Sequence, residues 1–302
     1  MSINESNLID EMHLGKGGWS KSSRMLEKSI LFLSLCLVAF CILLPLLYMF
    51  SLAFKDEMAI FEYPVRLITK EMTLDNFKKL FLNDSGQFDL NSFPIYILNS
   101  FKLTFIIMFI QIFTSTTAAY AFAKLKWKGR ELLFMIYIAS IMIPVQVLII
   151  PQFIFVRNLG LYNTHLAIIL LGSFTAFGTF LVKQYFMTIP DSLLEAARID
   201  GANEFYIYYK IMLPLSKPAI AAQMIFSFRY FWNDFFVPMI YLTDAHLKTI
   251  PLGMMDFVTE SFVYYGAQMA ACVLSVLPVL CIFLFAQKYF MAGFVAQGGV
   301  KG

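Results

Sequence analysis

Long apolar stretches separated by shorter polar ones dominate this chain. A helix needs about 20 apolar residues to cross the roughly 30 Å hydrocarbon core of a bilayer, and six stretches reach or approach that length. They are 29–52, 95–123, 132–156, 164–187, 218–242 and 269–291. The pattern predicts an all-α integral membrane protein with six transmembrane helices. The third stretch contains Pro144 and Pro151, which membrane helices tolerate, so we expect it to cross as one span.

The composition supports lipid as the solvent for much of the surface. Of the 302 residues, 59% are hydrophobic and 14% are charged, against about 25% charged residues in soluble domains. The net charge of +3 is too small to suggest a nucleic-acid partner. The first apolar stretch is longer than the roughly 7–15 residues of a signal-peptide core, so we predict a retained first helix.

The basic residues predict the orientation of the spans. The link 124–131 holds Lys124, Lys126, Lys128 and Arg130, whereas the link 157–163 holds only Arg157. The positive-inside rule therefore places 124–131 in the cytoplasm. With six spans, the amino-terminal segment 1–28, the loop 188–217 and the tail 292–302 are then also cytoplasmic, and the loops 53–94, 157–163 and 243–268 are outside. The loop 53–94 carries five basic residues, but it is long and also acidic.

The chain offers little for catalysis or metal binding. His13, His165 and His246 lie far apart in sequence, and the four cysteines form no C-x-x-C pair, so we expect no metal site. The phosphate-binding pattern G-x-x-x-x-G-K-[ST] is absent. A membrane enzyme would need a cluster of polar catalytic residues at membrane depth, and the sequence shows none. We therefore expect a non-catalytic chain without a cofactor of its own.

The loop 188–217 predicts a helix, a sharp turn and a second helix. Ser192 and Glu195 have capping-box spacing after Pro190 and Asp191, and Gly201 suits the left-handed end of a helix. The second helix is expected from about Asn203 to Pro214. An apolar face is formed by Leu193, Leu194 and Ala197. The physical pattern leaves two readings open, a docking surface for a partner or an interfacial helix on lipid headgroups.

The same loop resembles the signature of the permease subunits of ABC importers. That signature is Glu-Ala-Ala, three residues, Gly, nine residues and Ile-x-Leu-Pro, and it is matched without a gap by Glu195, Ala196, Ala197, Gly201, Ile211, Leu213 and Pro214. Further segments are similar to the carbohydrate (maltose-type) branch of this family: 118–123 with the basic link, 142–144, 160–164, 232–235 and Val300-Lys301-Gly302. The resemblance extends over nearly the whole chain.

The resemblance implies a type I ABC importer permease fold in the cytoplasmic membrane of a prokaryote. This chain would be the shorter, six-span member of a pair with a second, non-identical permease. A cytoplasmic ABC ATPase dimer would bind the ATP, and an extracellular solute-binding protein would deliver a sugar or oligosaccharide. The loop 188–217 would insert into a cleft of the ATPase, where Glu195 would meet a basic group. Alternatively, Glu195 serves only as the cap of its own helix.

Arg229 departs from the family pattern, which usually has an apolar or small residue there. It lies eleven residues past Pro218, or ~16 Å into a helix, where an arginine costs roughly 2.5–3.5 kcal/mol. We expect it to line the translocation path or to pair with a carboxylate of the second permease. Asn233 follows at i+4, and Tyr230 and Trp232 are the candidate sugar-stacking aromatics.

Two rival functions follow from the same residues. A stand-alone secondary transporter commonly shows internal repeats and broken helices near the midplane; no convincing repeat is present here, and intramembrane acids for ion coupling are sparse. A permease of the same family could instead import a solute other than a sugar. The sequence does not name the solute.

Overall fold

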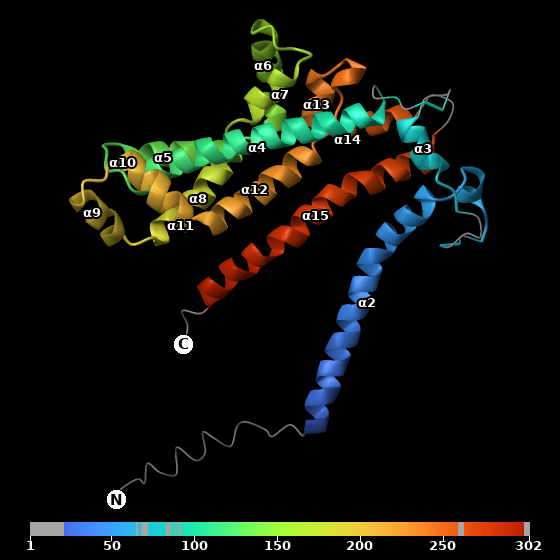
Figure 1. The fold of residues 1–302 in the computed structure, drawn as a ribbon, viewed down its shortest axis with the longest axis horizontal. Coiled ribbons are helices and arrows are strands. Elements are labelled where there is room, and N and C mark those ends of the chain that lie inside the picture. Colours follow the sequence, from blue (N-terminus) through green and yellow to red (C-terminus); the bar gives the residue numbers. More distant parts are fainter. Residues whose placement is uncertain are drawn as a thin grey trace, which may run out of the picture.

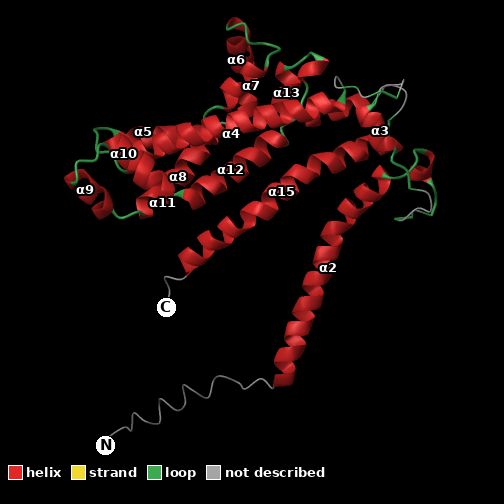
Figure 2. Cartoon of the chain, viewed as in Figure 1, coloured by secondary structure: helices red, strands yellow, loops and turns green. Residues whose placement is uncertain are grey.

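A computed structural model describes residues 21–64, 66–67, 72–82, 86–87, 89, 92–258 and 263–298. The expected motif Val300-Lys301-Gly302 lies outside these residues. The regular elements within them are helices, apart from one isolated β-bridge between Val258 and Val263 (Figure 2). The all-α expectation is therefore confirmed over the described part of the chain.

One group of helices follows the apolar stretches (Figure 1). They are α2 (Lys21–Ala53), α4 (Phe93–Ala123), α5 (Arg130–Ala139), α6 (Val145–Asn158), α7 (His165–Gly172), α8 (Ala176–Thr188), α12 (Lys217–Trp232), α13 (Phe236–Tyr241) and α15 (Tyr265–Gly298). The other α-helices, in the segments between those stretches, are α3 (Asp75–Phe81), α9 (Asp191–Ile199), α10 (Glu204–Tyr206), α11 (Leu213–Leu215) and α14 (Ile250–Gly253).

Four helical segments of the described chain are long and apolar enough to cross a membrane. They are Glu27–Ala53, Phe93–Ala123, His165–Thr188 and Tyr265–Phe285. Two bent pairs, Arg130–Met142 with Val145–Asn158 and Glu204–Leu215 with Lys217–Trp232, raise the number to six if each pair is one span. The chain is thus an all-α membrane protein with four to six candidate spans.

The third apolar stretch is not the single helix that we expected. It is bent by 99° between α5 and α6, and Ile143 at the bend is extended, with φ −84° and ψ 115°. A proline disfavours helical geometry at the residue before it, so Pro144 accounts for the break. Pro151 lies inside α6 without ending it, which shows that only one of the two prolines acts as a breaker.

A buried polar network surrounds another break, between α7 and α8. The Gln111 amide nitrogen on α4 donates to the Gly172 carbonyl at 2.7 Å, and its amide oxygen accepts from the Ser227 hydroxyl at 2.7 Å. The Thr114 hydroxyl donates to the Ser173 carbonyl at 3.1 Å. Carbonyl groups freed at a helix break in lipid need such partners, so side chains of α4 satisfy the break that α7 and α8 create.

Helix α4 forms the centre of the bundle. It packs along α8 and α12, and α15 packs against α12 and α2 (Figure 1). Phe93, Phe228 and Trp232 are among the largest buried side chains of the core cluster that these helices share. The most apolar part of α2 has no buried residue within this chain, so lipid or another subunit must cover it.

Candidate functional site

The loop 188–217 folds as a helical hairpin. Helix α9 ends near Gly201, whose φ of +84° places it in the left-handed region. Asn203 then caps α10, because its side-chain oxygen accepts from the Tyr206 N–H at 2.8 Å. A wider π-helical turn, Ile207–Met212, follows α10. The observed hairpin has the helix–turn–helix order expected from the sequence.

Two local expectations for this hairpin were wrong. Helix α9 begins at Asp191 after Pro190, with no side-chain hydrogen bond at the cap, so Ser192 and Glu195 form no capping box. The helix starts two residues earlier than the box requires, which leaves Ser192 inside the first turn. Pro214 does not stop the second helix, since it occupies the first turn of α11, where its missing N–H costs little. The bend of 76° comes at the junction with α12.

The inner face of the hairpin is buried against the membrane helices. Leu194, Ile207 and Met212 are almost wholly buried in a cluster that includes Tyr120 of α4 and Phe186 of α8. The Tyr208 hydroxyl is within hydrogen-bonding distance of the hydroxyls of Thr116 at 2.8 Å and Thr117 at 3.2 Å. The hairpin is therefore packed on the ends of α4 and α8 and does not hang free.

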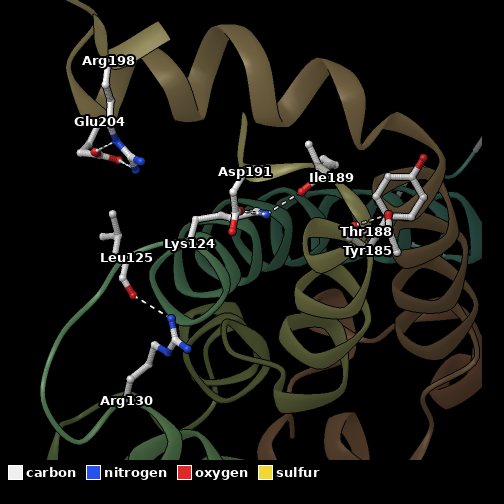
Figure 3. Close-up of polar contacts among 9 residues, drawn as sticks. All are labelled: Lys124, Leu125, Arg130, Tyr185, Thr188, Ile189, Asp191, Arg198 and Glu204. Carbon is white, nitrogen blue, oxygen red and sulfur yellow. Dashed lines mark hydrogen bonds and ion pairs between the residues drawn. The ribbon is translucent and has the colours of Figure 1, made fainter. Parts of the chain in front are cut away.

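Charged contacts close the hairpin and join it to α4 (Figure 3). The Arg198 guanidinium donates to both Glu204 carboxylate oxygens, at 2.8 and 3.3 Å, and the Tyr120 hydroxyl donates to the same carboxylate. The hydrogen bonds from Arg198, and next from Tyr120, hold the pKa of Glu204 below its usual value. The two helices of the hairpin are thus linked to each other and to α4 through one carboxylate.

Lys124 makes a second connection, between α4 and the start of α9. Its ammonium group donates to the Ile189 carbonyl at 2.7 Å and to the Asp191 carboxylate at 2.5 Å (Figure 3). The Lys124 hydrogen bond and charge lower the pKa of Asp191. This lysine belongs to the basic link 124–131, so the link and the hairpin lie at the same end of the bundle.

The outer face of the hairpin exposes much of the sequence signature. Glu195, Ala196, Gly201 and Pro214 are exposed, whereas Ala197, Ile211 and Leu213 are partly buried. Glu195 makes no hydrogen bond or ion pair with any residue in the described ranges, and it caps nothing. Its carboxylate is therefore available to another molecule.

Sequence reasoning missed the apolar residues around this signature. Ile199 and Phe205, on either side of the Gly201 turn, are 86% and 74% exposed, and Tyr209 is also exposed. Single exposed apolar residues need no explanation, but a group of them favours a docking surface. The sequence did contain a sign of this surface, because Ile199 and Phe205 are apolar although they do not lie on the buried face of their helices.

Three of the four candidate path residues lie on α12 and Asn233 directly follows it, and the four fall on two faces. Arg229, Tyr230 and Asn233 are exposed. Trp232 is fully buried, its indole nitrogen donates to the Ser275 carbonyl at 2.9 Å, and its ring stacks on Phe228. The structure therefore corrects the expectation that Trp232 stacks on a solute, because this face of α12 packs against α4 and α15.

We predict that Glu204→Gln loosens the hairpin and removes its acid sensitivity. The lowered pKa of Glu204 means that its ion pair contributes stability above the unfolded pKa, near 4.5. This contribution is lost as pH falls through the lower, folded value. Both partners are partly exposed, so we expect only about a threefold change in amide protection of 191–215. Amide exchange at several pH values measures it.

Glu131→Gln is the matched control for this prediction. Glu131 pairs with its neighbour Arg130 at 2.8 Å, outside the hairpin, so this change should leave the protection of 191–215 as it is. An exchange profile of Glu204→Gln that coincides with the unsubstituted protein at every pH would show that the carboxylate does not hold the hairpin.

No group of three or more His, Cys, Asp or Glu side chains that could hold a metal ion occurs among the described residues. The residues of the hairpin and of α12 instead offer surfaces: an exposed carboxylate with apolar neighbours on one, and an exposed guanidinium with polar neighbours on the other. Neither arrangement contains a nucleophile beside a general base, so both suit binding and not catalysis.

Nearly the whole chain is similar to known permease proteins. The arabinooligosaccharides transport system permease protein AraQ of Halalkalibacterium halodurans is 32% identical over 275 residues, which are 90% of this chain and 96% of that protein. The sn-glycerol-3-phosphate transport system permease protein UgpE of Salmonella typhi is 36% identical over 258 residues, covering 84% and 91%.

Solved structures and a family model extend the comparison. A chain in the crystal structure of a bacterial ABC transporter involved in the import of the acidic polysaccharide alginate superposes with a TM-score of 0.78, at 25% identity, over 90% of this chain and 99% of that one. Residues 111–294, which include the hairpin and α12, match the family model. The chain therefore belongs to the family described as the binding-protein-dependent transport system inner membrane component, and it is a non-catalytic, multi-pass permease of a bacterial inner membrane.

Proposed function

We propose that this chain is the permease subunit of an ATP-driven ABC importer for a sugar or oligosaccharide, and that its hairpin 188–217 receives the work of a separate ATPase. The observation that carries the proposal is that the two faces of the hairpin differ. Its outer face presents an unpaired Glu195 beside exposed apolar residues, while its inner face is buried on α4 and α8. Such an element can bind a partner and still move with the membrane helices.

The hairpin contacts suggest how the movement is transmitted. Leu194 and Met212 are buried against α4 and α8. The Tyr120 hydroxyl donates a hydrogen bond to Glu204, and the Lys124 ammonium group donates one to Asp191. A displacement of α9 by a partner therefore pulls on the same ends of α4 and α8. If the partner binds one position of α9 more tightly in one nucleotide state, the equilibrium between two conformations of the bundle shifts. The size of the shift is set by the difference between the partner's affinities for the two conformations.

The full assembly that we propose has four kinds of protein. They are this chain, a second non-identical permease, a cytoplasmic ABC ATPase dimer and an extracellular solute-binding protein. The amino and carboxyl termini of this chain and its hairpin would lie in the cytoplasm, as the basic link predicts. ATP would be bound by the ATPase alone.

The names of the relatives support a carbohydrate-like solute. They mention arabinooligosaccharides, sn-glycerol 3-phosphate and alginate, which share a polyhydroxylated carbon chain. Since the glycerol-phosphate relative is the more identical of the two permeases reported, a phosphorylated polyol is a second candidate solute. Both candidates use the same assembly and the same hairpin.

Reconstitution tests the proposal directly. The two permeases, the ATPase and the binding protein would be placed in vesicles, and uptake of arabinooligosaccharide, alginate oligosaccharide and sn-glycerol 3-phosphate would be followed. We expect uptake to require both ATP and the binding protein. Uptake driven by a proton or sodium gradient without ATP would instead make the chain a secondary transporter. The solute that raises the melting temperature of the binding protein identifies the cargo.

A further inference from the structure

One face of α12 is exposed although the helix lies in a membrane-spanning stretch. Phe226, Arg229, Tyr230 and Asn233 are all exposed, and their spacing of three, four and seven residues puts them on one stripe of a helix. Ser227, Phe228 and Trp232, between them in sequence, are buried. We call the four exposed residues the α12 stripe. In Figure 1, α12 lies between α4 and α15, which cover its buried face.

Arg229 is the charged member of the α12 stripe. Its guanidinium makes no hydrogen bond or ion pair with any other residue in the described part of the chain. The Asn233 amide donates to the Arg229 backbone carbonyl at 2.8 Å, not to its side chain. An unpaired arginine near mid-membrane is unfavourable in hydrocarbon, so the α12 stripe does not face hydrocarbon.

The backbone beside the α12 stripe is broken. Helix α12 ends at Trp232 and α13 begins at Phe236, and the opposite end of the stripe contacts the start of α8 through an edge-on pair, Phe177 with Phe226, at 5.6 Å. Non-helical backbone at membrane depth is tolerated where protein buries it or where it lines a water-filled cavity. A water-filled cavity beside this break would explain why an arginine is exposed there.

A tight seam with the second permease explains the α12 stripe less well. Helices that approach closely in membranes do so through small residues such as Gly, Ala and Ser. The α12 stripe contains Phe, Arg, Tyr and Asn, which are all large or polar. Asp234 does not neutralise Arg229 within this chain, because no ion pair joins them and its carboxylate accepts from the Phe236 N–H at 3.1 Å and the Val237 N–H at 3.3 Å.

We propose that Arg229 is a specificity-determining residue that recognises a negatively charged group, a carboxylate or a phosphate, on the solute during its passage. The proposal rests on the importer function proposed above and names the solute class as an acidic or phosphorylated sugar or polyol. A guanidinium binds both anions through paired hydrogen bonds. Tyr230 adds an aromatic face, and Asn233 adds an amide on the same stripe for hydroxyl groups.

The test measures the charge preference at the α12 stripe without needing the solute. The sample is the complete complex in lipid nanodiscs, studied with and without ATP. In this chain Asn233→Cys supplies the only thiol, because the native cysteines are replaced; they are Cys36, Cys41, Cys272 and Cys281. It is reacted with anionic sulfonatoethyl methanethiosulfonate and with cationic trimethylammonioethyl methanethiosulfonate, and each rate is divided by that of a free thiol. We expect Arg229→Gln to lower the anionic-to-cationic rate ratio about fivefold, and Arg229→Lys to keep most of it.

One control site and a second reporter thiol keep the outcome decisive. Met58→Cys, at a residue of the short 3-10 helix Met58–Phe61 that is 87% exposed, should give a rate ratio that Arg229→Gln does not change. Tyr230→Cys reads the same stripe if Asn233→Cys does not assemble. A ratio that Arg229→Gln leaves unchanged, or thiols that neither reagent reaches in either state, would overturn the proposal. ATP-dependent uptake by the unsubstituted complex separates this failure from a failure of the importer function.

Discussion

Glu195→Lys is expected to leave the importer assembled and to reduce ATP-dependent uptake by at least about tenfold. Like charges placed opposite each other across an interface cost several kcal/mol, and about 2 kcal/mol already corresponds to about 30-fold in binding. Glu195 is exposed and makes no contact by hydrogen bond or ion pair within the described chain, so the fold of this subunit loses nothing. Uptake and ATP hydrolysis, measured in the same vesicles, would show whether hydrolysis continues without transport.

Asp200→Lys is the matched control for Glu195→Lys. Asp200 is exposed at the end of the same helix, and its substitution makes the same change in charge. If the partner contact is specific to Glu195, Asp200→Lys should affect uptake much less. Equal losses in both variants would mean that general repulsion acts on the hairpin, and unchanged uptake in Glu195→Lys would refute the coupling role.

The parts of the structure that follow from local patterns could be predicted from the sequence. Hydropathy located the long helices, and the spacing of the signature located the hairpin, because helix length and the Gly201 turn depend on residues close together in the chain. The start of α9 could not be located in this way. The first residue of α9, Asp191, pairs with Lys124, which is 67 residues away in sequence, and a local pattern does not contain this contact.

Contacts between distant segments account for the other differences. Trp232 was a candidate for solute stacking because aromatic residues near Arg229 suit that role, but the face that α12 buries is decided by α4 and α15. The Arg198–Glu204–Tyr120 connection likewise joins the hairpin to a helix more than 80 residues earlier. In the third apolar stretch, two prolines allow a break at either position, and the backbone leaves helical geometry at Ile143 and Pro144 but not at Pro151.

Gly201→Val should abolish most ATP-dependent uptake through the backbone alone. A Cβ at this position would meet no atom within 4 Å, so there is no clash, but the φ of +84° is one that L residues rarely adopt. A left-handed conformation costs roughly 1–2 kcal/mol for such residues and more for a β-branched one. The turn should therefore rearrange, separate Arg198 from Glu204 and point α9 away from its proposed contact with the ATPase.

Gly201→Asn separates conformation from side-chain size, because asparagine tolerates the left-handed region several-fold better than other non-glycine residues. We expect Gly201→Asn to retain most uptake. Gly201→Val should reduce uptake to about a tenth or less, because a reoriented α9 would lose contacts with its proposed partner of the kind that dominate binding at an interface. Gly160→Val imposes a similar backbone penalty at φ +69°, also in open space, between α6 and α7, and should leave hydrolysis coupled to uptake. If valine and asparagine at 201 support equal uptake, the geometry of this turn does not determine how the hairpin meets its partner.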